Sequence, residues 1–112
     1  MSSFSEKGLL GELEQLVLLA VTQLQGQAHA PAIRDTIDDR TGIELARGTV
    51  YVTLDRLERK GYLDSRFGDP TPERGGKAKR LFRITAAGTR ALAEAERALA
   101  RMRAASAPAR SR

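Results

Sequence analysis

Positively charged side chains gather in the second half of the sequence, where their number and spacing fit a polyanionic ligand. Residues 1–45 hold 3 Lys and Arg against 7 Asp and Glu, whereas residues 46–112 hold 16 against 7. The densest group is Lys77, Lys79 and Arg80, directly after a pair of glycines. Concentrated cationic charge of this kind is typical of proteins that bind nucleic acid. A basic surface that only keeps the protein soluble is the plain alternative.

Other chemistries lack the residues that they need. The 112-residue chain has no Cys and a single His, His29, so it offers no thiolate nucleophile and no zinc site built on Cys. Asp35, Asp38 and Asp39 are better explained as the solvated face of a helix than as cation ligands. Gly75-Gly76 lacks the spacing of a phosphate-binding loop. We therefore expect no catalytic residue, no metal and no cofactor.

Composition and length predict one globular domain. Hydrophobic residues make up 41% and charged residues 29% of the chain, as in ordinary soluble proteins. The longest apolar run, residues 16–21, is far shorter than the ~20 residues of a membrane span. The first residues lack the pattern of a secretion signal. These observations predict a cytoplasmic protein without a membrane partner.

Three helices are expected before the cationic region. Apolar residues recur at three- and four-residue steps from Leu9 to Leu24, and some lie on other faces, which a second copy of the chain or the core itself would cover. Pro31 suits the first turn of a second helix, which Gly42 ends. A third helix is expected from about Arg47 to Lys60. The inner stripe of this third helix consists of Val50, Leu54 and Leu57.

A β-hairpin and a final helix are expected to follow. Residues 62–67 and 78–84 have the composition of strands, and the stretch between them is dense in turn-forming residues. Thr85 fits the N-cap of the last helix. Its apolar residues follow at steps of three, four and three, the narrow seam of a helix that pairs with another. This order of elements, α-α-α-β-β-α, predicts a mainly α winged helix-turn-helix fold with a small β-hairpin.

Two motifs of the sequence resemble those of the PadR-type transcriptional regulators. Residues 46–63, with Gly48-Thr49-Val50-Tyr51 followed by Leu57-Glu58, are similar to the recognition helix of that family. Residues 76–88, a basic stretch that ends in Ile84-Thr85-Ala86-Ala87-Gly88, are similar to the exit of its wing. The resemblance covers about residues 9–103 and is nearest to the short-form branch. It implies a homodimeric repressor of transcription whose small-molecule effector binds at the dimer interface.

The expected contacts to double-stranded DNA come from the third helix and the wing. A major groove admits one helix, and cations of the wing can reach the phosphates beside it. For Tyr51, a half-buried ring that seals the helix against the wing is the alternative, and for the other polar residues it is capping or solvation. The expected DNA-binding residues are Arg47, Thr49, Tyr51, Thr53, Arg56, Lys77, Lys79 and Arg80.

The first and last helices are expected to form the homodimer. The predicted interface consists of Leu10, Leu13, Val17, Leu92, Ala95, Leu99 and Met102. None of the five aromatic residues lies on these helices, so we expect either a small aliphatic effector or none. The expected segments are a flexible N-terminus (1–8), a winged-helix domain (9–84) with its wing at 68–80, a dimerisation helix (85–103) and a disordered tail (104–112).

A different function remains open at this stage. A winged helix can also serve as a protein-interaction module, with its basic wing bound to an acidic partner. Non-specific binding to nucleic acid is a third, weaker alternative. The charge pattern alone does not separate these alternatives from a sequence-specific regulator.

Overall fold

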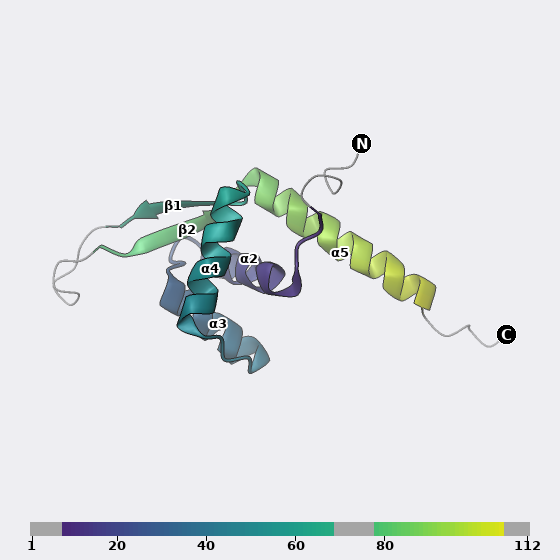
Figure 1. The fold of residues 1–112 in the computed structure, drawn as a ribbon, viewed down its shortest axis with the longest axis horizontal. Helices are drawn as coiled ribbons and strands as arrows, with labels where there is room; N and C mark the ends of the chain where they lie inside the picture. Colours follow the sequence, from purple (N-terminus) through teal and green to yellow (C-terminus); the bar gives the residue numbers. More distant parts are fainter. Residues whose placement is uncertain (1–7, 69–77, 107–112) are drawn as a thin grey trace.

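The computed structural model describes residues 8–68 and 78–106. Its elements follow the order α2 (Glu12–Leu24), α3 (Ala30–Thr41), α4 (Arg47–Arg59), β1 (Leu63–Phe67), β2 (Arg80–Ile84) and α5 (Ala86–Ser106). Helices α2 to α4 pack together, while the hairpin and the distal part of α5 project from them in opposite directions (Figure 1). The predicted winged-helix fold and its order of elements are confirmed.

Helix α2 forms the centre of the hydrophobic core. Val17 and Leu18 have no exposed surface, and Ile33 of α3 and Leu57 of α4 are also completely buried. α2 contacts α3, α4, β2 and α5, so elements of the same chain cover its several apolar faces. The excess of apolar residues on this helix is therefore explained by the core and does not require a second copy.

The sequence signals at the helix ends have the expected backbone geometry, except at the start of α2. Gly42 ends α3 with φ 75°, and its N–H donates to the Asp38 carbonyl over 2.7 Å. Gly61, with φ 82°, follows α4; such angles favour glycine. α2 begins at Glu12, not at Leu9, because Gly11 is extended and its N–H donates to the Glu14 carboxylate over 2.9 Å.

The two strands form an antiparallel hairpin that is fastened to the connection between α2 and α3. Leu63 pairs with Ile84 and Phe67 with Arg80, and Ala28 forms a bridge with Phe82. Phe82 is 2% exposed, so its ring anchors the hairpin to the core. Most of the predicted wing, including Lys77, lies outside the described residues.

Thr85 and Gly88 attach α5 to the rest of the domain. The Thr85 hydroxyl accepts a hydrogen bond from the Gly88 N–H (3.0 Å) and donates one to the Gly61 carbonyl (2.7 Å), which confirms its capping position. A Cβ on Gly88 would lie 2.3 Å from the Tyr62 carbonyl oxygen, so only glycine allows this close approach.

Helix α5 is longer than the sequence predicted. It continues to Ser106, so residues 104–106 are helical and do not belong to a disordered tail, because Ala104 and Ala105 favour helix. Residues 107–112 lie outside the described part. Within the described ranges, no helix has both the length and the apolarity to cross a bilayer.

Candidate nucleic-acid interface

Helix α4 separates an apolar inner side from a polar outer side. Val50, Leu54 and Leu57 are at most 1% exposed, and the spacing of three and four residues between them places them on one side of the helix. The opposite side is exposed and has mostly polar side chains. We call the exposed surface of this helix the α4 face; it consists of Gly48, Thr49, Tyr51, Val52, Asp55, Arg56 and Arg59, together with Arg47, which is exposed at the first position of the helix although it is in line with the inner side.

Three arginines of the α4 face are available to an external anion. Arg47, Arg56 and Arg59 are exposed, and within the described ranges none of them forms an ion pair. The Arg47 guanidinium lies 5.8 Å from the centre of the Tyr51 ring, close enough for a cation–π interaction. That contact orients Arg47 at the N-terminal end of α4 and leaves its hydrogen-bond donors accessible.

The predicted DNA contact of Thr53 is wrong. Its side chain is 2% exposed, and its hydroxyl donates to the Thr49 carbonyl over 2.8 Å. Thr53 lies three residues after Val50 and four before Leu57, so it belongs to the inner side of α4. Thr49, in contrast, is exposed.

Lys60, directly after α4, faces the protein and not the solvent. Its ammonium contacts the Glu14 carboxylate over 2.8 Å. Burial of Glu14 acts to raise the pKa of its carboxyl, but the hydrogen bonds from Lys60 and the Gly11 N–H, with the charges of Lys60 and Arg56, outweigh this and keep the pKa below its ordinary value. This ion pair connects the end of α4 to the start of α2 and contributes no external charge.

Arg80, one of the predicted phosphate contacts, has a carboxylate partner on α4 and a side chain that is 38% exposed. Its guanidinium forms an ion pair with Glu58 of α4 and donates to the Ser65 hydroxyl over 3.2 Å. The Ser65 hydroxyl itself donates to Glu58 over 2.6 Å. This network ties the base of the wing to α4, so Arg80 positions the wing and its charge is neutralised by a carboxylate.

Lys79 lies beside the N-terminal half of α4. It lines a cavity of about 260 Å³ together with Arg47, Tyr51 and Phe67. Arg80 and Phe82 also line this cavity, and Phe67 is 69% exposed, so aromatic rings and cations of the hairpin and of α4 border the same hollow. The structure thus brings Arg47, Tyr51 and Lys79 together.

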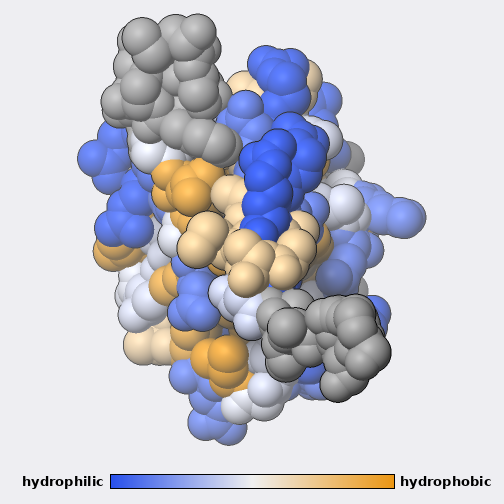
Figure 2. All heavy atoms as spheres, turned by 90° about the vertical axis from the view of Figure 1, so that its right-hand side faces the viewer, coloured by the Kyte–Doolittle hydropathy of each residue, from blue (hydrophilic) through white to orange (hydrophobic). Residues whose placement is uncertain are grey.

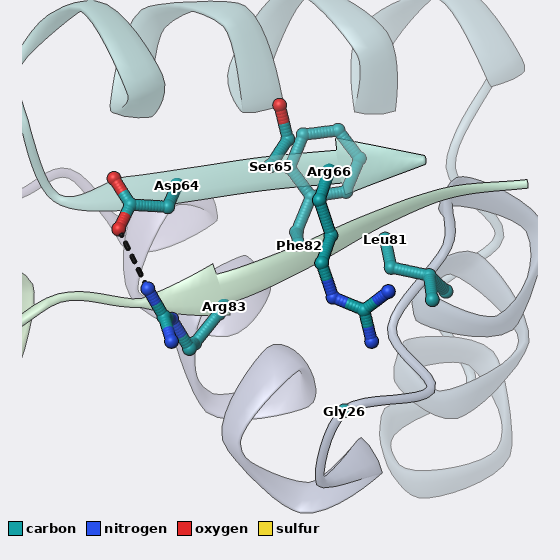
Figure 3. A pocket seen from close by; sticks show the side chains of 7 residues that line it. All are labelled: Gly26, Asp64, Ser65, Arg66, Leu81, Phe82 and Arg83. Carbon is teal, nitrogen blue, oxygen red and sulfur yellow. Dashed lines mark hydrogen bonds and ion pairs between the residues drawn. The ribbon is translucent and has the colours of Figure 1, made fainter. Parts of the chain in front are cut away.

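The outer side of the hairpin carries a cation that the sequence prediction omitted. Figure 3 shows Arg66 and Leu81 over a pocket of about 240 Å³, with Asp64 bound to Arg83 at 3.1 Å. Arg66 has no ion pair within the described part of the chain. Because side chains alternate between the two faces of a strand, Arg66 lies on the same face as Asp64. The sequence alone could therefore have placed this cation on the outer side of the hairpin.

The predicted dimer residues separate into two groups. Leu10, Val17, Leu92 and Ala95 are at most 8% exposed and belong to the hydrophobic core of a single chain, and Leu13 packs against the same core. Leu99 and Met102 are 43% and 66% exposed. In the view onto the C-terminal end of α5, apolar side chains in orange lie beside charged ones in blue (Figure 2).

Comparison with known proteins places this arrangement of elements among transcriptional regulators. Residues 17–94 match the model of the transcriptional regulator PadR-like family. A PadR family transcriptional regulator from Eggerthella lenta is 31% identical, with a TM-score of 0.65 over 81% of this chain and 79% of that chain. No curated protein matches the chain.

Two further solved structures show the same fold. A transcriptional regulator from Clostridium thermocellum is 19% identical, with a TM-score of 0.70 over 83% of this chain and 87% of that chain. The PcaV transcriptional regulator from Streptomyces coelicolor, solved in complex with its natural ligand, is 28% identical, with a TM-score of 0.58 over 83% of this chain and 57% of that chain. In these comparisons, the known proteins similar to this chain are regulators and not enzymes.

Proposed function

The chain belongs to the PadR-like family of transcriptional regulators, and from this membership we propose that it acts as a homodimeric repressor that binds a palindromic operator. The α4 face enters the major groove of each half-site. Lys79 and Arg66 contact the phosphates beside it. Two copies of the chain, related by a two-fold axis, place two α4 helices in successive major grooves.

The exposed arginines of α4 carry this proposal. Arg47 and Arg59 lie at the two ends of the helix, about 18 Å apart along its axis at 1.5 Å per residue. A helix that lies in the major groove has the phosphates of a DNA backbone on either side, within reach of long side chains such as these. Lys60, Arg80 and Arg83 each have a carboxylate partner, whereas Arg47, Arg56 and Arg59 form no ion pair within the described residues.

The distal half of α5 supports the homodimer. Leu99 and Met102 lie three residues apart on one side of this helix, and both are largely exposed. Isologous pairing of two such helices buries both residues in each of the two copies. A ligand held at this interface would be small and aliphatic, because the aromatic residues in the described ranges (Tyr51, Tyr62, Phe67 and Phe82) lie outside α2 and α5.

The test is selection of duplex DNA from a random library by the full chain, followed by footprinting on the selected sequence. We expect protection of an inverted repeat and a complex with two chains per duplex. Arg59→Ala should weaken binding about 5- to 50-fold, in the range of a lost charge-assisted contact.

Arg90→Ala is the matched control, because it removes the same charge from an exposed helical site on α5. We expect less than a twofold effect from this variant. Equal losses for Arg59→Ala and Arg90→Ala would show that only net charge matters, and recovery of no common sequence would contradict sequence-specific binding.

A further inference from the structure

One apolar side chain lies in the middle of the polar α4 face. Val52 is 55% exposed, and the helical period places it opposite the buried Val50, Leu54 and Leu57. Its neighbours one turn away in either direction are Gly48 and Arg56, and Asp55 lies on the same outer side. Val52 is therefore an isolated hydrophobic group on a surface that otherwise presents charges and hydroxyls.

Nothing within the described chain accounts for valine at this position. Val52 is absent from the hydrophobic core and from the partly buried residues that pack against it. Valine is also a poorer helix former than the alanine, lysine or glutamate that commonly occupy exposed helical sites. The side chain neither adds to the core nor favours the helix, so its role lies in the proposed complex.

The chemistry of Val52 narrows its DNA partner to one group. A phosphate or the polar edge of a base requires a charge or a hydrogen-bonding group, which valine lacks. The floor of the major groove presents one apolar group, the 5-methyl of thymine. We propose that Val52 packs against a thymine methyl in each half-site and so determines sequence preference there; this inference rests on the proposed function.

The position of Val52 along α4 suits this contact. At 1.5 Å per residue it lies about 8 Å from Arg47 and about 10 Å from Arg59 along the helix axis. Arg56 and Arg59 follow Val52 by one and two turns on the same side of α4, so a duplex held by these two arginines lies against Val52. Gly48, one turn earlier, has open space around its Cα, so no side chain keeps the helix away from the bases.

The experiment removes the two terminal methyl groups of Val52 on the protein and the 5-methyl of thymine on the DNA. In the duplex selected by the wild-type chain, each thymine and its symmetry mate are replaced by deoxyuridine, and binding is measured for wild type, Val52→Ala and Ile43→Ala. Uracil differs from thymine only by the 5-methyl. Ile43 is an exposed apolar residue outside α4, at 44% exposure, and serves as the matched control.

We expect one symmetric pair of substitutions to weaken wild-type binding about 15-fold, which is about fourfold per buried methyl at two half-sites. This penalty should fall below twofold for Val52→Ala and persist for Ile43→Ala. The inference is overturned if no thymine is sensitive, or if the penalty is the same in Val52→Ala. Failure to select any common sequence would instead refute the proposed function itself.

Discussion

Two surfaces of this chain have no partner among its described elements, and their chemistry differs. The α4 face presents three arginines against one aspartate, with a hydroxyl, a phenol and one valine, whereas the distal half of α5 presents Leu99 and Met102. Salt bridges show the same contrast, because the carboxylates of Glu14 and Glu58 neutralise only the cations that hold α4 in place. The exposed charges therefore remain for an anion, and the exposed apolar stripe for another protein surface.

In both α4 and α5, the position of a residue within the helix decides its role. On α4, Thr53 is buried and Val52 exposed although they are neighbours. On α5, Leu92 belongs to the core while Leu99, two turns later, is exposed. A helix that extends beyond its own domain changes from a core element to a candidate interface along its length.

The largest effect is expected at α5. Leu99→Asp combined with Met102→Asp should abolish the dimer, because burial of each such side chain contributes about 1.5–3 kcal/mol and the two-fold axis doubles it. Operator affinity should fall at least about 100-fold through loss of bivalent binding. Analytical ultracentrifugation measures the first effect and fluorescence anisotropy the second.

Ala100→Asp combined with Ala104→Asp is the control for this prediction. It adds the same charge to exposed positions on another side of α5 and should leave the dimer intact. If both double variants remain dimeric, the apolar stripe is not the interface.

The second largest effect is expected at Gly88, where α5 packs against the backbone of Tyr62. Gly88→Ala should destabilise the fold by about 1–3 kcal/mol, because the added methyl overlaps the Tyr62 carbonyl and must displace backbone. Gly48→Ala should instead stabilise α4 by up to about 1 kcal/mol, because its surroundings are open. Thermal unfolding of both variants checks this; an unchanged Tm for Gly88→Ala would contradict the close packing.

A smaller effect is expected from the ion pair between Lys60, directly after α4, and Glu14. Unlike the exposed arginines of α4, Lys60 has its charge neutralised within the chain. The pKa of Glu14 lies below its value in the unfolded chain, so the stabilisation is complete above the unfolded pKa of about 4.3 and is lost as pH falls through the folded pKa. Glu14→Gln should remove this dependence, so the wild type should lose more stability than the variant as the pH falls from 7 to 3. Urea unfolding between pH 3 and 7 measures it, and equal pH profiles for both proteins would be the contrary result.

The smallest effect separates Lys79 from Arg80. Lys79→Ala should weaken binding to random duplex DNA about two- to fivefold and reduce the slope of log K against log salt by about 0.9, the contribution of one phosphate. Arg80→Ala should leave that slope unchanged and lower the Tm, because Arg80 is bound to Glu58. A reduced slope for Arg80→Ala would show instead that Arg80 contacts a phosphate.

Local signals in the sequence were sufficient for the order of elements. The glycines at 42 and 61, the cap at Thr85 and the periodicity of α4 each act within a few residues, so their consequences are visible in the chain itself. Thr53 was misplaced although its spacing from Val50 and Leu57 already marked the inner side. Periodicity thus gave the right helix, and residue type was given too much weight within it.

Contacts between distant residues could not be predicted in this way. Glu14 and Lys60 are 46 residues apart, and Glu58 and Arg80 are 22 apart, so no local pattern indicates which cations are neutralised. The seam on α5 was visible, but periodicity does not say whether an apolar side faces its own chain or a second copy. Packing of α5 against α2 decided this for Leu92 and Ala95.

The central claim is that DNA binds the α4 face and leaves the stripe on α5 to the second copy. Titration of the ¹⁵N-labelled full chain with the selected duplex, followed by amide NMR spectra, tests it directly. The account predicts large shifts for Gly48, Val52 and Arg59 and small ones for Leu99 and Met102. Large shifts confined to α5, with the α4 amides unchanged, would contradict it.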